Sequence, residues 1–350
     1  MSETQQQYIK KIISIVDKTS PTFCLAKWHH VTLYLQTGET HSCYHPAPHK
    51  VDLAELKKNP SALHNTSIKK QERKEMLEGV QTKGCQYCWN IENMGLDYIS
   101  DRHIKTASIF TEKRYKQIVD NPWDKNVNPE YIEISFGNEC NFKCGYCHPK
   151  ASSRFYNEIK QYGPVTSVKN HRCDIDWMDL YEREEKNPYV DAWWKWWPTA
   201  RKTLSILRIT GGEPLLGWQR AYPDLLSHEK MRSLKEITFE TNGTQELSQD
   251  FSIYLQQWKM NREKNALTFS VSPKLSISGE KWEEAICPEI VASYQNLGTV
   301  YLKFVVETDE HIEEAKRATK EFRDAGFNGV VYLMPQGGIV APYDSNKVRI

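Results

Sequence analysis

The sequence lacks any apolar run near the length that crosses a bilayer, and it lacks a dominant charge. A membrane-spanning helix needs about 20 consecutive apolar residues, so the sequence predicts no membrane span or membrane partner. Its 46 Lys and Arg residues against 45 Asp and Glu residues leave a formal charge of +1. That balance disfavours nucleic acid as a partner, because phosphate binding needs a basic surface. The polar start "MSETQQQ" is not typical of a signal peptide, and we expect a cytoplasmic protein.

Cysteine, in contrast, is plentiful, with nine residues in a chain of 350. Disulfides are rare in a reducing compartment. Regularly spaced cysteines in such a chain therefore predict the ligation of a metal or an iron-sulfur cluster.

Six short β-rich runs alternate with helical patterns from about residue 131 onward. They cover residues 131–136, 204–210, 236–241, 266–272, 299–306 and 329–334. The clearest helical pattern covers residues 309–325, where apolar side chains fall on one face. Such alternation indicates parallel strands joined by right-handed crossovers. We therefore predict an α/β fold, a partial (βα)6 barrel of the TIM type, with its functional end at the C-terminal ends of the strands.

The remaining sequence predicts two further regions. Residues 1–125 carry four cysteines and are expected to form an accessory domain that precedes the barrel of residues 126–350. A segment at about 155–201 breaks the strand–helix rhythm and contains "DAWWKWWPTA". We interpret it as a Trp-rich insertion whose aromatic side chains serve packing, with a lid over the active end as the alternative.

Three cysteines occur in the stretch "CNFKCGYC", directly after the first predicted barrel strand. Cys140, Cys144 and Cys147 have the spacing C-x3-C-x2-C, and Gly137 and Gly145 allow the loop to turn back on itself. Three thiolates suit a [4Fe-4S] cluster whose fourth iron stays open to another ligand. A zinc site would need a fourth ligand, for which His148 is adjacent. We favour the cluster.

This motif, with Tyr146 before its last cysteine, resembles the signature of radical S-adenosylmethionine enzymes. The resemblance implies that Cys140, Cys144 and Cys147 ligate the cluster and that Tyr146 lies near the adenine. It also implies an electron donor such as flavodoxin or ferredoxin. The activity would be that of an oxidoreductase or a lyase, in which a 5'-deoxyadenosyl radical formed from S-adenosylmethionine abstracts hydrogen from the substrate.

Polar or glycine-rich stretches follow four later strands, as "TGGEP", "ETNGT", "SPK" and "LMPQG". Glycine permits close approach of a backbone to a bound group. In this order, the stretches over residues 204–338 resemble the 7-carboxy-7-deazaguanine synthase family. The resemblance implies a substrate contact at Thr210 and S-adenosylmethionine contacts at Gly211, Gly212, Glu213, Glu240, Asn242, Ser272, Lys274 and Gln336. His148 and Pro149 depart from that family's pattern, which leaves magnesium unsupported.

The N-terminal cysteines form a second set. Cys24 and Cys43 bracket a predicted hairpin, which would bring them close, and Cys85 and Cys88 form a C-x2-C pair. Four thiolates can close a metal site completely. The pattern C-x13-G-x4-C followed by C-x2-C resembles the auxiliary-cluster motif of twitch and SPASM domains. That resemblance implies an auxiliary iron-sulfur cluster, and structural zinc is the alternative.

Two substrate classes follow from these patterns. The N-terminal cysteines favour a peptide or protein substrate, whereas the later strand ends favour a small heterocycle of the pterin type. A non-catalytic iron-sulfur or zinc binding module is a third hypothesis, but it would give the polar strand ends no purpose.

Overall fold

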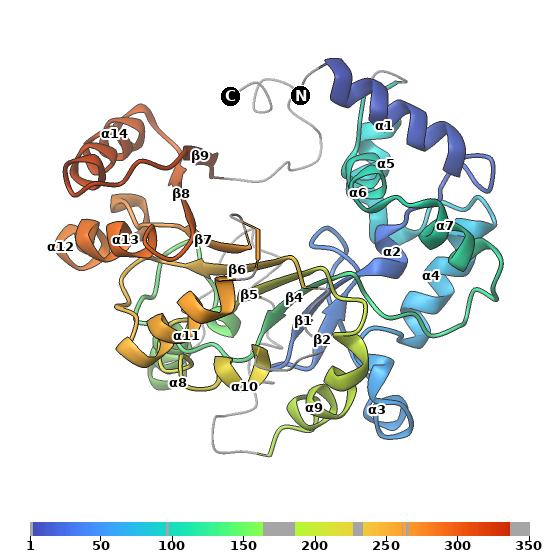
Figure 1. The fold of residues 1–350 in the computed structure, drawn as a ribbon, viewed down its shortest axis with the longest axis horizontal. Coiled ribbons are helices and arrows are strands. Elements are labelled where there is room, and N and C mark those ends of the chain that lie inside the picture. The colour runs from blue at the N-terminus through green and yellow to red at the C-terminus, as the bar shows by residue number, and fades with distance from the viewer. Residues whose placement is uncertain are drawn as a thin grey trace. The chain divides into compact units, whose positions relative to one another are not determined.

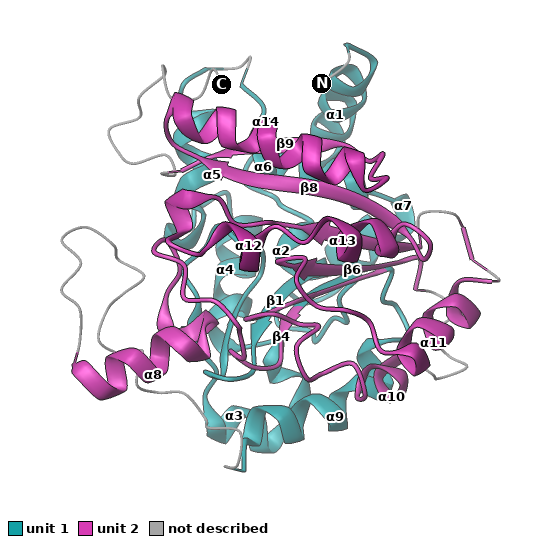
Figure 2. Ribbon diagram, turned by 90° about the vertical axis from the view of Figure 1, so that its left-hand side faces the viewer, with its two compact units in different colours: residues 1–133, 185–205 teal, residues 134–184, 206–350 magenta. Residues whose placement is uncertain are grey.

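A computed structural model describes residues 3–95, 98–163, 186–226, 234–260, 262–263 and 266–336 (Figure 1). The fold is mixed α/β. The chain divides into unit 1, residues 1–133 with 185–205, and unit 2, residues 134–184 with 206–350 (Figure 2). The sequence predicts a domain boundary between residues 125 and 126, and the two units divide between residues 133 and 134. Of the expected insertion, residues 164–185 lie outside the described residues, and its Trp-rich end belongs to unit 1.

Unit 2 is built on strands that follow one another in chain order within the sheet, β4-β5-β6-β7-β8-β9, and the strands from β5 to β9 pair in parallel. The strands are β4 (Tyr131–Ser135), which begins in unit 1, β5 (Ile206–Thr210), β6 (Glu236–Thr241), β7 (Leu267–Val271), β8 (Thr299–Val306) and β9 (Val331–Pro335). All six strands predicted from periodicity are confirmed to within two residues at each end. Because each crossover advances to the next strand, right-handed connections place the linking helices on one face of the sheet.

The helices of unit 2 follow the strands as predicted (Figure 1). They are η3 (Pro149–Ala151), α8 (Ser153–Tyr162), α10 (Tyr222–Leu226), α11 (Gln249–Lys259), η7 (Ser276–Ser278), α12 (Trp282–Ala285), α13 (Pro288–Tyr294) and α14 (Asp309–Asp324). Helix α14 begins with a capping box between Thr308 and His311, and it buries Ala315, Ala318 and Phe322. The helix expected over 309–325 is thereby confirmed.

The strands of unit 2 have one apolar and one polar face, because side chains alternate along a strand. In β8, Val300, Leu302, Phe304 and Val306 are buried, while the residues between them are less so. Arg208, Glu240 and Lys303 occupy the alternate positions on three strands, and their exposed fractions are 30%, 17% and 20%. A row of charged side chains therefore crosses the sheet.

Unit 1 combines helices with three antiparallel strands, which occupy the order β3-β2-β1 in the nine-stranded sheet of the chain. Its elements are α1 (Glu3–Val16), α2 (Ala26–His29), β1 (His30–Tyr34), β2 (Glu39–His41), β3 (His49–Lys50), α3 (Leu53–Lys58), η1 (Pro60–Leu63), α4 (Ser67–Leu77), η2 (Lys83–Cys85), α5 (Gln86–Glu92), α6 (Asp101–Ile109), α7 (Glu112–Val119) and α9 (Pro188–Ala200). The pairing of Thr32 with His41 confirms the predicted hairpin.

Packing explains most of the aromatic cluster in α9. Trp193, Trp196 and Trp197 are at most 3% exposed, and the rings of Trp193 and Trp197 stack at 4.7 Å between centroids. Trp194 is 44% exposed on the outer side of the helix. In the described parts of both units, no helix has the length and apolar character needed to cross a membrane.

Candidate functional site

The three cysteines of the loop after β4 lie together. Cys144 is buried with Phe142 and Ala285, and Cys140, Cys147 and Tyr146 pack against this cluster. A turn closes the loop, because the N–H of Cys147 donates to the carbonyl of Cys144 at 2.8 Å. One short loop thus presents three thiols in one place.

Hydrogen bonds from distant parts of unit 2 hold this loop. The N–H of Cys140 donates to Ser153 Oγ at 3.1 Å, at the start of α8. On the other side, the N–H of Gly145 donates to the carbonyl of Ser278 at 2.8 Å. The loop is therefore fixed by the helix that follows it and by the segment after β7.

The environment of Cys140 and Cys144 favours the protonated forms of their thiols. Burial raises the pKa of Cys140 to about 12 and the pKa of Cys144 to about 11. The neighbouring thiols of the loop raise both pKa values further, which shows that the three sulfurs interact, whereas Lys274 lowers that of Cys144. Lys274 Nζ also lies 5.8 Å from the ring centroid of Tyr146. A cation that binds the thiolates would offset these costs.

The glycine pair after β5 packs directly on the cysteine loop. A Cβ atom on Gly212 would lie 2.2 Å from the carbonyl oxygen of Glu139 and 2.6 Å from that of Asn138. Gly211 has φ 134°, a conformation that side chains disfavour. The close approach expected toward a bound group is thus an approach to the main chain that precedes Cys140.

Glu213 connects the loop after β5 to the end of β6. Its carboxylate is 1% exposed and accepts hydrogen bonds from Thr241 Oγ1 at 2.7 Å, the N–H of Asn242 at 2.6 Å and the N–H of Leu215 at 3.1 Å. Burial raises its pKa to about 7. Asn242 in turn donates through Nδ2 to Asn141 Oδ1 at 2.8 Å, inside the cysteine loop.

The other predicted cofactor residues occupy several strand ends. Lys274 Nζ donates to Ser272 Oγ at 3.3 Å, and the N–H of Ser272 donates to the carbonyl of Thr241 at 2.8 Å. Thr210 is the last residue of β5, immediately before Gly211. Gln336 is exposed after β9, and its N–H donates to the carbonyl of Val306 at 2.7 Å.

Sequence reasoning missed the partners of Glu240. Its Oε1 accepts from Arg208 at 2.7 Å, and its Oε2 accepts from Ser270 at 2.9 Å and from Lys303. The period-2 pattern of polar residues in β5, β6, β7 and β8 could have indicated this shared face. The network makes Glu240 a part of a charged row rather than an isolated carboxylate.

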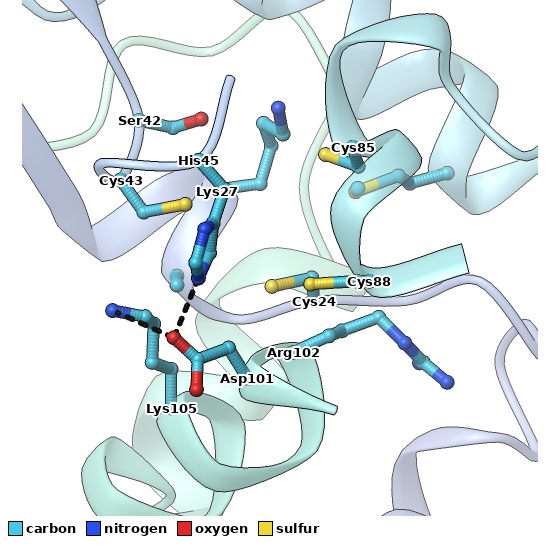
Figure 3. Close-up of a pocket in the computed structure, with 12 residues that line it drawn as sticks. Cys24, Lys27, Ser42, Cys43, His45, Cys85, Cys88, Asp101, Arg102 and Lys105 are labelled. Atoms are coloured by element: carbon cyan, nitrogen blue, oxygen red, sulfur yellow. Dashed lines mark hydrogen bonds and ion pairs between the residues drawn. The ribbon is translucent and has the colours of Figure 1, made fainter. Parts of the chain in front are cut away.

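In unit 1, the four N-terminal cysteines line one pocket, shown in Figure 3. Cys24 precedes α2, Cys43 follows β2, Cys85 ends η2 and Cys88 lies on α5. The other lining residues are Ala26, Lys27, Ser42, His45, Met76, Asp101, Arg102 and Lys105. The structure therefore brings together the four cysteines that their spacing singled out.

Burial also favours the neutral thiols of Cys24, Cys43 and Cys88 in the absence of a cation. It raises the pKa of Cys43 to about 11 and raises the pKa values of Cys24 and Cys88. Negative charge on Cys24, Cys43 or Cys85 raises the pKa of Cys88 further, as expected for thiols that lie close together.

Sulfur donors of both sets suit iron or zinc, which bind deprotonated thiols. As the side chains stand, no group of three or more His, Cys, Asp or Glu residues in the described ranges is placed to hold a metal ion. The fit therefore rests on donor chemistry and on the shared location of each thiol set. Ligation would require the side chains to turn toward a common ion.

Comparison with known proteins identifies no relative. No family model matches the chain, and no curated protein matches it either.

Proposed function

We propose that this protein is a radical S-adenosylmethionine enzyme whose parallel strands form a partial barrel. The observation that carries the proposal is the packing of Cys140, Cys144 and Cys147 in one loop at the C-terminal end of β4. The glycine pair Gly211 and Gly212 lies against the same loop. Active sites of barrels occupy this end of the strands.

The residues of unit 2 have separate roles in this proposal. Cys140, Cys144 and Cys147 would hold a [4Fe-4S] cluster, and Tyr146 and Lys274 flank it. A cluster held there would supply one electron, delivered by a donor such as flavodoxin or ferredoxin, for the cleavage of S-adenosylmethionine to methionine and a 5'-deoxyadenosyl radical. The protein would orient the cofactor and exclude water from the site. Glu213 fixes the main chain at Asn242, so that the end of β6 faces the cysteine loop.

A second centre is proposed in unit 1. The pocket of Cys24, Cys43, Cys85 and Cys88 offers four sulfur ligands, which suits an auxiliary iron-sulfur cluster that needs no external ligand. Zinc is the alternative for the same donors.

The favoured substrate is a peptide or a protein, because the four-thiol pocket resembles the auxiliary sites of peptide-modifying enzymes. The alternative is a pterin-type heterocycle. The row of Arg208, Glu240 and Lys303 supports this alternative, because it supplies donors and acceptors on the sheet face. Reaction with carboxytetrahydropterin, followed by a search for a deazaguanine product, separates the two classes.

The radical activity itself is tested with anaerobically reconstituted protein, dithionite and S-adenosylmethionine. We expect 5'-deoxyadenosine from the wild type and none from Cys144→Ala. Cys287→Ala is the matched control, since Cys287 lies outside both thiol sets. Iron-loaded wild type that forms no 5'-deoxyadenosine would contradict the proposal and favour a non-catalytic binding module.

A further inference from the structure

Two cationic side chains near the four-thiol pocket are completely buried. Lys69 and Arg73 lie one turn apart on α4, and both are 0% exposed. Other cations at the pocket have carboxylate partners: Lys27 pairs with Glu72 at 2.8 Å, and Arg102 pairs with Glu92 at 2.8 Å. Lys105 and Asp101 are 3.7 Å apart. Among the described residues, neither Lys69 nor Arg73 takes part in an ion pair.

The hydrogen-bond partners of these two residues are neutral. Lys69 Nζ lies 3.1 Å from His64 Nδ1 and 3.5 Å from the carbonyl of His41. His64 Nε2 lies 2.7 Å from the carbonyl of Trp28, so this nitrogen carries the proton and Nδ1 accepts from Lys69.

Arg73 has a similar environment. It donates from Nη1 to Asn65 Oδ1 at 2.9 Å and from Nε to the carbonyl of Lys27 at 3.2 Å. These contacts satisfy donors without supplying negative charge.

A buried cation without a close counter-ion is costly, and burial accordingly lowers the pKa of Lys69 and lowers that of Arg73 to about 9. A nearby anion offsets that cost and favours the charged forms. Lys27, Lys69 and Arg73 share one carboxylate, that of Glu72, whose charge acts on all three. Further negative charge can come from the pocket, because Lys27 lines it, Arg73 donates to the Lys27 carbonyl, and Lys69 interacts electrostatically with Cys43. Four thiolates around a doubly charged metal ion or cluster core form a dianion. With the Glu72 carboxylate set against Lys27, the charges of Lys69 and Arg73 remain, and they match that dianion.

We propose that Lys69 and Arg73 are positioning residues that stabilise a dianionic tetrathiolate centre at Cys24, Cys43, Cys85 and Cys88. This inference rests on the second centre proposed above and does not depend on the radical chemistry of unit 2. The two cations act through charge, from outside the set of ligands. They favour the loaded pocket over the neutral, metal-free one.

The test uses Co²⁺ alone as the probe, in full-length protein that carries Cys140→Ala, Cys144→Ala and Cys147→Ala. Only the pocket cysteines then offer a set of thiolates, and Co²⁺ binding is followed by thiolate-to-cobalt charge-transfer absorption. We expect Lys69→Met to weaken Co²⁺ binding by about tenfold or more, as loss of one nearby charge in a partly buried site implies. Lys69→Arg keeps the charge and should retain most of the affinity.

Lys74→Met is the matched control, because Lys74 lies on the same helix and its side chain is 41% exposed. It should leave Co²⁺ affinity unchanged. A merely structural Lys69 would instead lower the stability of the metal-free protein without changing affinity. Arg73→Met, read out in the same way, provides an independent variant if Lys69→Met does not fold.

Affinity of Lys69→Met and Arg73→Met within about twofold of the parent protein would overturn the inference. A parent protein without any thiolate–cobalt absorption would remove the second centre and this inference together. Formation of 5'-deoxyadenosine by the wild type would still support the proposed function of unit 2, so the two failures are distinguishable.

Discussion

The carboxylate of Glu213 accepts a hydrogen bond from the main-chain N–H of Asn242 at 2.6 Å. Because the side chain of Asn242 then donates to Asn141, one chain of contacts leads from the loop after β5 to the cysteine loop. The carboxylate is sealed from solvent along this path. Protonation of Glu213, or its replacement by another residue, is therefore expected to affect the whole site.

The contribution of Glu213 to the stability of the metal-free protein should decrease as the pH rises from about 4.5 to 7. The buried His29, His30, His41 and His49 contribute in the opposite sense, because burial lowers their pKa values, so the Glu213 contribution is measured as a difference from a variant. Burial raises the pKa of Glu213 from 4.5 to about 7, so in this window the folded state holds a proton that the unfolded state releases. The contribution is complete below pH 4.5 and is lost as the pH passes the folded-state pKa. It amounts to roughly 3 kcal/mol, and urea unfolding at several pH values measures it.

Glu213→Gln should remove this contribution, so that its stability relative to the wild type rises by that amount between pH 4.5 and 7, whereas Glu283→Gln, at an exposed position, should keep the wild-type pH dependence. An unchanged slope in Glu213→Gln would show that another group titrates.

Gly212→Ala should destabilise the protein by about 1–3 kcal/mol, as expected for overpacking. The new Cβ would meet two main-chain carbonyls at 2.2 and 2.6 Å, and neither can move without shifting the cysteine loop. Gly145→Ala is the matched control, since its Cβ would lie 3.8 Å from the nearest atom, the carbonyl oxygen of Ser278. Chemical denaturation of the metal-free proteins compares them, and equal stability of the two variants would contradict the predicted clash.

Lys274→Met should slow the alkylation of Cys144 in the metal-free protein. Burial raises the pKa of this thiol, and the charge of Lys274 lowers it, so loss of the lysine leaves less of the reactive thiolate. Iodoacetamide labelling followed by peptide mass spectrometry gives the rate at Cys144. The exposed Lys281→Met serves as the control and should label like the wild type. Faster labelling of Cys144 in Lys274→Met would contradict the conclusion that Lys274 lowers the pKa of this thiol.

Iron content should distinguish the two centres. Reconstituted wild type is expected to hold about eight irons per chain, and Cys85→Ala with Cys88→Ala about four, if both sets bind cubic clusters. The double variant should still release 5'-deoxyadenosine, because its radical loop is intact. A product profile unchanged by the double substitution would remove any role of the auxiliary centre in the reaction. If the metal bound in unit 1 is zinc and not iron, the pocket of Cys24, Cys43, Cys85 and Cys88 is a zinc site.

Local sequence patterns were enough to locate the strands of unit 2. Alternating side chains and flanking turn residues depend on neighbours within a few positions, and β6 and β8 match their predicted limits. The grouping of Cys140, Cys144 and Cys147 is likewise local. The grouping of the four N-terminal cysteines followed from a hairpin and a C-x2-C pair, which are both short-range features.

The sequence by itself therefore determined the alternating strands and helices and the two cysteine sets. Only the tertiary structure decided that Gly212 abuts the main chain of Asn138 and Glu139, that Glu213 supports Asn242, and that Lys69 is buried with neutral hydrogen-bond partners. These properties depend on partners far apart in the chain, as with Asn141 and Asn242, which are separated by 101 positions. Burial and charge pairing arise only when the folded chain brings such segments together, and no local pattern encodes them.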